Sequence, residues 1–171
     1  MCLSPTHPSF QSYNQEIQTI LQSNQPYFEK YIQERYTHKL PMVIFDIDDT
    51  LLSTVGMGEA CFLTLPRIKP VVEFYYWLKR KGYRIVLITA RQENVEAITK
   101  ANLQKEGIVG YDHLFTRNLS DMYVPIGNYK LNKRKMLSNQ YDIVGNIGDQ
   151  ITDFYGGYSG RIIKLPNYSL G

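Results

Sequence analysis

The sequence predicts an α/β protein, a three-layer α/β/α sandwich built around a mostly parallel five-stranded sheet. From Pro41 onward, short apolar runs rich in β-branched residues alternate with segments that have the period of a helix. Strands that alternate with helices are joined by right-handed crossovers, so the sheet is expected to be covered on both faces. The length of 171 residues and the 43% of hydrophobic residues are typical of one globular domain.

Residues 1–39 are expected to form an N-terminal helical extension of the same domain, and residues 40–171 to form its core. Ile17, Ile20 and Leu21 recur at helical spacing in the extension, as do Phe28 and Ile32. One or two amphipathic helices are therefore predicted, covering an edge or a face of the sheet. A lid or a partner surface is the alternative role.

Five strands and three helices are expected in the core. The strands are predicted at residues 42–47, 83–89, 112–116, 143–147 and 161–165. The helices are predicted at residues 70–82, 93–106 and 128–140. Pro70 favours the first turn of the first helix, Gly82 favours its end, and Asn128 is expected to cap the third helix.

Composition excludes several classes of protein. The formal charge of +3 is too small to indicate a nucleic-acid partner, and Cys2 and Cys61 form neither a metal-ligand spacing nor a disulfide framework. No run approaches the ~18 to 20 apolar residues of a membrane span. As written, the chain is expected to be soluble and cytoplasmic, or exported if its N-terminus was trimmed. Neither nucleic acid nor membrane is expected as a partner, and a homodimer is left open.

Polar side chains follow three of the predicted strands. The first strand ends in Asp46, with Asp48 just after it, Thr89 ends the second strand, and Asp149 and Asp153 follow the fourth. Ligands of an open parallel sheet bind beyond the carboxyl ends of its strands. We therefore expect these side chains to meet at one edge of the sheet.

The aspartates predict a metal site. On an extended backbone Asp46 and Asp48 point to the same side, with roughly 6 to 7 Å between their Cα atoms, while Asp49 points away. Asp149 adds a third negative charge. Each pair of unit charges at ~4 Å costs about 4 kcal/mol at an effective dielectric constant near 20, so a cation must offset the repulsion. Oxygen ligands without nearby His or Cys favour Mg²⁺.

The same residue types suit phosphoryl transfer. A carboxylate held against Mg²⁺ can attack phosphorus and form an aspartyl phosphate, while a second carboxyl group protonates the leaving alkoxide and later deprotonates water. A hydroxyl and a cation should face the equatorial oxygens, and Thr89 and a lysine would serve.

Lys130 is the preferred lysine. A cation in the first turn of a helix opposes the helix dipole by roughly 0.3 to 1 kcal/mol, so a lysine just after Asn128 suggests a purpose other than helix stability. Lys133 is the second choice. Arg134 and Lys135 are expected on a solvated basic face.

These residues resemble the haloacid dehalogenase (HAD) superfamily of phosphohydrolases, whose four motifs occur here in order. They are DIDDT at residues 46–50, LITAR containing Thr89, a lysine in YKLNKRKML, and GDQITD at residues 148–153. The chain is most similar to the subfamily IIIB acid phosphatase branch, which includes plant vegetative storage proteins and bacterial class B and class C acid phosphatases. That closer likeness rests on Tyr129, Lys130, Lys133, Arg134, GNIGDQ and KLPN. The resemblance covers about residues 41–167.

The resemblance implies a Rossmann-like fold and a role for each motif residue. Asp46 would be the nucleophile and Asp48 the general acid and base. Thr89, Ala90 and Lys130 would bind the phosphate. Mg²⁺ would be held by the Asp46 side chain, the Asp48 carbonyl and Asp149, with Asp153 beside the metal or bound to it through water. Dehalogenases of the superfamily lack the second aspartate, so Asp48 favours phosphate chemistry.

One departure from this branch is the short segment after the first motif, and it bears on the size of the substrate. Residues 53–66 are too few to build the larger insert that relatives carry, so a minimal cap or none is expected. Gly56 and Gly58 permit a mobile flap, and a plain loop is the alternative. Small phosphomonoesters are the expected substrates. The alternative is a macromolecular substrate, a phosphoprotein or a nucleic-acid end.

Two rival functions use the same parts. A receiver domain of two-component signalling also takes phosphate on aspartate, but its acidic pair comes first in the chain and its acceptor later, the reverse of the order here. The other rival is a catalytically idle binding or storage protein with this fold.

Among the remaining residues, Asp49 is expected to be structural, Arg91 and Asp112 to be ordinary helix or loop charges, and Tyr123 and Tyr155 to lie near the site. The three histidines show no ligand spacing.

Overall fold

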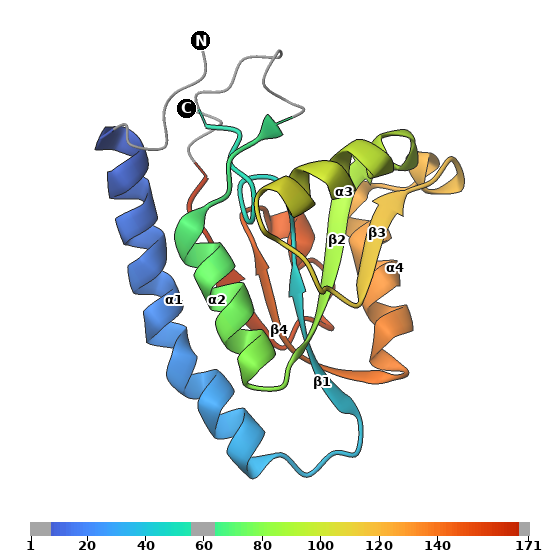
Figure 1. Cartoon of the computed structure of the whole chain (residues 1–171). Helices are drawn as coiled ribbons and strands as arrows, with labels where there is room; N and C mark the ends of the chain where they lie inside the picture. Colours follow the sequence, from blue (N-terminus) through green and yellow to red (C-terminus); the bar gives the residue numbers. More distant parts are fainter. Residues whose placement is uncertain (1–7, 56–63, 168–171) are drawn as a thin grey trace.

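The computed structural model describes residues 8–55 and 64–167, which form a five-stranded parallel sheet between helices (Figure 1). The strands are β1 (Leu40–Phe45), β2 (Arg84–Gln92), β3 (His113–Arg117), β4 (Tyr141–Gly148) and β5 (Arg161–Lys164). The helices are α1 (Pro8–Glu34), α2 (Lys69–Arg80), α3 (Glu96–Lys105) and α4 (Ile126–Ser138), with short 3-10 helices η2 (Glu93–Val95), η3 (Ser120–Tyr123) and η4 (Ile151–Asp153). The predicted fold class is confirmed.

The order of the strands explains where a ligand can bind. The sheet runs β3-β2-β1-β4-β5, and every neighbouring pair is parallel. Phe45 at the end of β1 pairs with Leu87 of β2 on one side and with Ile147 of β4 on the other. The carboxyl ends of these three strands therefore meet at one edge, and the order reverses direction beside β1.

Both faces of the sheet are covered, because alternate side chains of β1 point to opposite sides. Val43 and Phe45 pack in a core with residues of α1, α2 and α3, whereas Met42 and Ile44 pack in a second core with residues of α4. The near-continuous apolar sequence of β1 and β2 follows from this two-sided burial.

The N-terminal extension forms a single 27-residue helix, α1, which packs beside α2 (Figure 1). Its fully buried Phe28 makes edge-to-face contacts with the rings of Phe74 and Tyr83. A Cβ on Gly145 of β4 would lie 2.7 Å from the Phe28 ring, so glycine is required for this close approach. The prediction that the extension covers the sheet is confirmed, while the domain boundary at residue 39 stays a prediction.

The predicted start of the last helix is wrong. The last helix begins at Ile126, because Pro125 takes the capping position and accepts a hydrogen bond from the Tyr129 N–H at 2.9 Å. Asn128 therefore lies inside the first turn and is not the cap, and Lys130 lies beyond that turn. The segment predicted as one helix over residues 93–106 begins as η2 before α3 continues it.

Part of the predicted flap, with Gly56 and Gly58, lies outside the described residues, as do Cys2, Cys61 and His7. The ends of this segment are joined, since the Ser53 N–H donates to the Pro66 carbonyl at 2.8 Å. No helix among the described residues is long and apolar enough to span a membrane.

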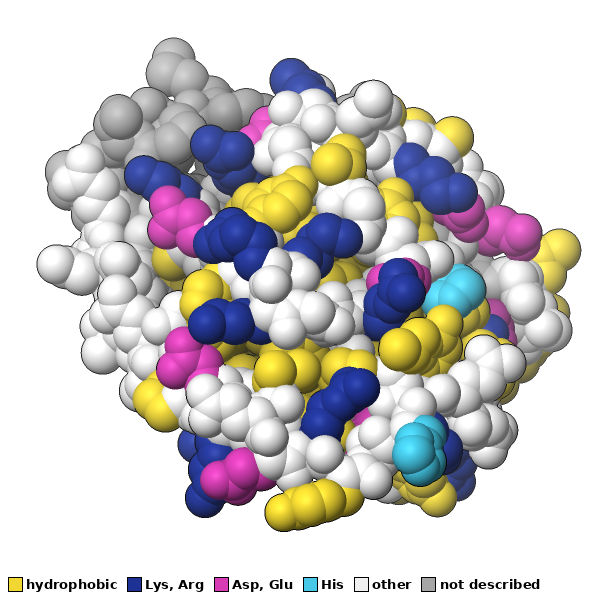
Figure 2. Space-filling model, turned by 60° about the horizontal axis from the view of Figure 1, so that its bottom comes forward, with side chains coloured by type: hydrophobic (Ala, Val, Ile, Leu, Met, Phe, Trp, Pro, Cys, Tyr) yellow, Lys and Arg dark blue, Asp and Glu magenta, His cyan; other side chains and the backbone are white. Residues whose placement is uncertain are grey.

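The face at the amino ends of the strands carries scattered Lys and Arg side chains with acidic ones between them (Figure 2). Two of these cations pair with carboxylates, Lys81 with Glu29 at 3.4 Å and Arg84 with Asp112 at 3.1 Å. A hollow of about 680 Å³ lies beside the end of α1 and the start of β4. It contains none of the predicted site residues, which lie at the other end of the strands.

Candidate active site

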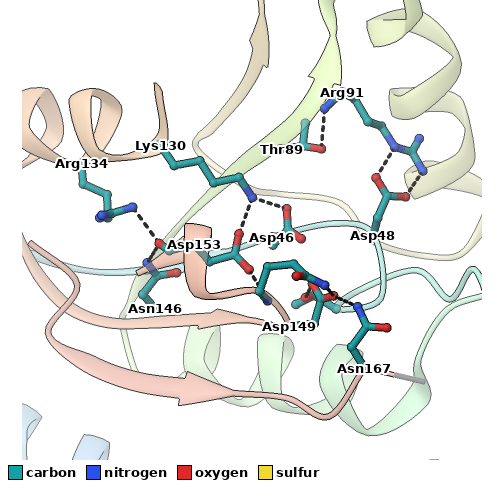
Figure 3. Close-up of polar contacts among 12 residues, drawn as sticks. Asp46, Asp48, Thr89, Arg91, Lys130, Arg134, Asn146, Asp149, Asp153 and Asn167 are labelled. Carbon is teal, nitrogen blue, oxygen red and sulfur yellow. Dashed lines mark hydrogen bonds and ion pairs between the residues drawn. The ribbon is translucent and has the colours of Figure 1, made fainter. Parts of the chain in front are cut away.

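The predicted site residues meet at the carboxyl edge of the sheet (Figure 3). Asp46 directly follows β1, Thr89 lies within β2, and Asp149 directly follows β4. Asp153 ends η4, the turn after β4, and Lys130 comes from α4. Because these elements converge at one edge, residues more than 100 positions apart in the chain become neighbours.

Three buried carboxylates form a cluster that could hold a metal ion. One oxygen each from Asp46, Asp149 and Asp153 lies within 4.8 Å of the others. Two amides donate to the same oxygen of Asp149, the Gln150 Nε2 at 2.9 Å and the Asn167 Nδ2. Asn167 follows β5 and belongs to the KLPN segment, to which sequence reasoning assigned no role. The two amides orient Asp149, and its other oxygen accepts a hydrogen bond from the Thr50 hydroxyl at 3.5 Å.

Lys130 bridges two members of this cluster. Its Nζ donates to Asp46 Oδ1 at 2.8 Å and also to Asp153 Oδ1, and its side chain is buried. Burial by itself lowers the pKa of Lys130, but the carboxylates of Asp46 and Asp153 outweigh this effect and raise it. The lysine is therefore a fixed positive charge at the site.

One lysine does not balance three carboxylates. Burial raises the pKa of Asp46 well above its ordinary value, and Asp153 and Asp149 raise it further, although Lys130 opposes the shift. Burial likewise raises the pKa of Asp149. A second cation would relieve this repulsion, and an all-oxygen set of ligands suits a hard divalent ion. The residues present therefore fit a divalent metal.

The turn after β4 requires glycine at position 148. A Cβ on Gly148 would lie 2.2 Å from Asp153 Oδ2, so any other residue would displace that carboxylate. The Gln150 N–H donates to the same oxygen at 3.0 Å as part of a capping box at η4. The GDQITD sequence thus folds back on itself and places Asp149 and Asp153 side by side.

Arg134 holds the backbone of this turn through hydrogen bonds. The prediction that Arg134 lies on a solvated face is therefore wrong. It is fully buried, and its guanidinium donates to the carbonyls of Asp153 at 2.7 Å, Gly157 at 2.9 Å and Tyr155. Burial lowers the pKa of Arg134 to about 10, so it remains charged at neutral pH. Its spacing of four residues from Lys130 puts both on one face of α4, so the sequence indicates that the two share a face but not what that face contacts.

The other basic residues of α4 lie away from the cluster. Lys133 lies 3.9 Å from Asp121 and over the rings of Phe115 and Tyr129, and Lys135 is exposed. The structure therefore brings Lys130, and not Lys133, to the carboxylates.

Asp48 does not join the three-carboxylate cluster. The expectation of an extended backbone through Asp48 is wrong, because β1 ends at Phe45 and the chain then turns, with the Leu51 N–H donating to the Ile47 carbonyl at 2.9 Å. The Asp48 carboxylate instead forms a two-point ion pair with Arg91, in which Nη2 lies 2.6 Å from Oδ1 and Nε lies 2.9 Å from Oδ2. Arg91 lies in β2 and is buried, so the prediction of an ordinary helix or loop charge is also wrong.

The remaining predicted residues lie around these groups. Thr89 is buried and its hydroxyl accepts the Arg91 N–H at 3.2 Å, while Ala90 is half-buried. Asp49 accepts two hydrogen bonds from Thr54, at 2.8 Å and 2.6 Å, which confirms its structural role.

Three further residues with sequence predictions lie outside the carboxylate cluster. Asp112 accepts the Ile85 N–H at 3.0 Å and pairs with Arg84, so its role in the strand connection is structural. Tyr123 and Tyr155 are both exposed.

A comparison with protein families identifies the family. Residues 63–170 match the model described as HAD superfamily, subfamily IIIB (acid phosphatase). Asp46 and Asp48 precede the matched range, so their place in the site rests on the structure. Since the match covers more than half of the chain, the protein belongs to this family.

Curated plant proteins are similar to this chain. A stem 28 kDa glycoprotein of Glycine max is 31% identical over 92% of this chain and 68% of its own length. Acid phosphatase 1 of Solanum lycopersicum is 31% identical over 72% of this chain and 56% of its own length. Vegetative storage protein 2 of Arabidopsis thaliana is 33% identical over 72% of this chain and 54% of its own length. The chain thus spans little more than half of the last two relatives.

Among solved structures, a class C acid phosphatase from Bacillus anthracis with tungstate bound has a similar fold. The TM-score is 0.76 at 18% sequence identity, over 96% of this chain and 81% of that one. An identity this low establishes the fold alone. Together with the family match, the fold defines the class of the protein, a phosphatase of the HAD type.

Proposed function

We propose that the protein is a Mg²⁺-dependent phosphomonoester hydrolase that works through an aspartyl phosphate on Asp46. The observation that carries the proposal is the buried carboxylate of Asp46, which lies at the centre of the strand ends within a cluster of three carboxylates and one lysine. Family membership supports phosphate chemistry at this site.

In the first step, an oxygen of Asp46 attacks the phosphorus of the ester. A phosphorus–oxygen bond forms to Asp46 while the bond to the leaving oxygen breaks, and Asp48, which enters this step in its protonated form, donates its proton to that oxygen. Lys130, already hydrogen-bonded to Asp46, donates to the equatorial oxygens of the phosphoryl group, and Thr89 offers them its hydroxyl. The alcohol leaves and the phosphoryl group stays on Asp46.

In the second step, water attacks the phosphorus from the side that the alcohol left. Asp48, now a carboxylate, takes the proton of this water, and the bond between phosphorus and Asp46 breaks. Inorganic phosphate leaves, and both aspartates return to their starting states.

Asp46 and Asp149 would hold the Mg²⁺ ion with their side chains, and Asp48 with its backbone carbonyl. Asp153 would lie beside the ion or contact it through water. When bound, the ion neutralises charge on the carboxylates and on the phosphate oxygens. Lys130 already bridges Asp46 and Asp153, so it holds two of these carboxylates in position before substrate arrives.

Small phosphomonoesters are the proposed substrates, since the segment between β1 and α2 is short and the acid phosphatase family indicates this class. A macromolecular ester remains the alternative. A screen of phosphate esters from nucleotides to phosphopeptides separates the two, because a macromolecular site would hydrolyse the phosphopeptide well and the small esters poorly.

A catalytically idle storage protein is the second candidate function, because vegetative storage protein 2 is among the relatives. The complete set of site residues favours the enzyme. The two candidates differ in one measurement, the hydrolysis of any phosphate ester by the purified protein.

The test of the proposed function uses an aryl phosphate in the presence of Mg²⁺. The wild-type protein should release phosphate, EDTA should stop the reaction, and Asp46→Asn should reduce turnover to background. Asp112→Asn is the matched control, because Asp112 is an acidic residue in an ion pair away from the site. Activity that survives in the Asp46→Asn variant would falsify the assignment of the nucleophile, and an inactive wild-type protein would favour the storage role.

A further inference from the structure

We propose that Arg91 is a positioning residue that holds the carboxylate of Asp48 in place for both proton transfers. This inference rests on the function proposed above, because it concerns how the general acid and base is oriented. The motif LITAR would then supply two parts of the site from one strand end, Thr89 for the phosphate and Arg91 for Asp48.

The geometry of the ion pair is the first argument. The two donors of Arg91, Nε and Nη2, each meet a different oxygen of Asp48, at 2.9 Å and 2.6 Å. Such a fork fixes both the position and the plane of a carboxylate, which a single contact does not. Figure 3 shows the two side chains facing each other beside Asp46, apart from the contacts of Lys130.

The exposure of the two partners is the second argument. The side chain of Arg91 is 4% exposed, whereas that of Asp48 is 33% exposed. The arginine is therefore the fixed partner and the aspartate the one open toward solvent and substrate. An ion pair with one buried and one partly exposed partner is weak evidence for a role in stability alone.

Two threonine hydroxyls hold Arg91 in position. Its Nη1 donates to the Thr99 hydroxyl of α3 at 3.0 Å, and that buried hydroxyl donates to the Val95 carbonyl at 2.9 Å. The Arg91 N–H donates to the Thr89 hydroxyl at 3.2 Å. The orientation of Asp48 is thus set by α3 through Arg91 and Thr99.

The clamp leaves Asp48 able to react. Each carboxylate oxygen has two lone pairs, and the fork uses one lone pair of each oxygen. One lone pair per oxygen is left to carry the proton for the leaving alkoxide, and later to accept the proton of the attacking water. Arg91 touches neither the ester nor the water in this scheme, so it acts only through Asp48.

The test compares two leaving groups. An aryl phosphate such as p-nitrophenyl phosphate needs little proton donation, because its leaving oxygen is weakly basic, whereas an alkyl phosphate such as glycerol 2-phosphate depends on it. We expect Arg91→Met to lower kcat/KM about tenfold more for the alkyl ester than for the aryl ester, part of the ~10²- to 10⁴-fold effect of a general acid. Arg91→Lys, which makes at most one contact, should fall between Met and wild type.

Arg84→Met is the matched control, since it removes an arginine from an exposed ion pair with Asp112 and should leave the ratio of the two rates unchanged. Thr99→Val removes the brace and keeps both charged groups, so it should shift the ratio in the same direction by less. If circular dichroism shows that Arg91→Met does not fold, Thr99→Val decides alone.

An equal loss of kcat/KM for both esters in a folded Arg91→Met variant would overturn the role of Arg91. If Arg91→Met does not fold, an unchanged ratio of the two rates in a folded Thr99→Val variant would overturn it. Either result would leave the proposed function standing. The proposed function fails separately, when the wild-type protein hydrolyses neither ester.

Discussion

Lys130 and Arg134 lie on the same face of α4 and interact with the same turn in different ways. Lys130 meets the carboxylates of Asp46 and Asp153, whereas Arg134 meets backbone carbonyls of residues 153–157. Asn146 also donates to the Asp153 carbonyl, at 2.8 Å. The side chain of Asp153 is thus held by the lysine and its backbone by the arginine, so a change at Arg134 should reach the carboxylate cluster.

Replacing Arg134 by methionine should destabilise the protein by about 2 to 4 kcal/mol, because buried carbonyls lose their charged donor. Urea unfolding measures this change. Lys135→Met is the control on the same helix, since Lys135 is exposed and should change the free energy of unfolding by less than about 0.5 kcal/mol. Equal effects of the two variants would show that the carbonyl contacts contribute nothing.

Among the elements, α1 depends on its aromatic contacts more than on its own helix propensity. The helix contains Pro26 and has no acidic residue in its first turn, so local sequence favours it weakly. Phe28 compensates by packing against Phe74 and Tyr83, and the Tyr83 hydroxyl donates to the Phe28 carbonyl at 2.7 Å. Tertiary packing therefore holds this element on the sheet.

Replacing Phe28 by alanine should lower the free energy of unfolding by about 3 to 5 kcal/mol, the range for a fully buried phenylalanine. Thermal and urea unfolding both measure it. Lys30→Ala is the control in the same helix, because its ion pair with Glu34 is exposed and 3.9 Å long. A Phe28→Ala variant as stable as Lys30→Ala would mean that α1 contributes little to the core.

At the scale of the whole molecule, the site is a local excess of negative charge in a chain with a formal net charge of +3. A ligand that binds only the folded state stabilises it, by about 2.7 kcal/mol at a concentration of 100 times Kd. MgCl₂ should therefore raise the melting temperature of the wild-type protein, and Asp149→Asn should abolish most of this increase.

Differential scanning calorimetry with MgCl₂ and with NaCl of equal ionic strength measures this effect without any substrate. Asp112→Asn should keep the full increase, because Asp112 lies outside the carboxylate cluster. The same increase in Asp149→Asn as in wild type would place the bound ion elsewhere.

Much of the fold and of the site could be predicted because the signals are local. The alternation of strands and helices follows from the spacing of apolar residues. The expectation that Asp46, Thr89 and Asp149 meet follows from their places at or near the ends of predicted parallel strands. The sequence does not fix the start of α4, because several residues in that segment can begin a helix and the backbone contact of Pro125 decides among them.

The sequence by itself determined the class of the fold, the edge at which the site forms and the kind of chemistry there, since periodicity and motif spacing are properties of neighbouring residues. Tertiary structure alone decided that Asp48 turns to Arg91, that Arg134 is buried beneath the turn after β4, and that Asn167 reaches Asp149. These contacts join residues 18 to 43 positions apart. They depend on how α3, α4 and the segment after β5 pack against the sheet, which no local pattern contains.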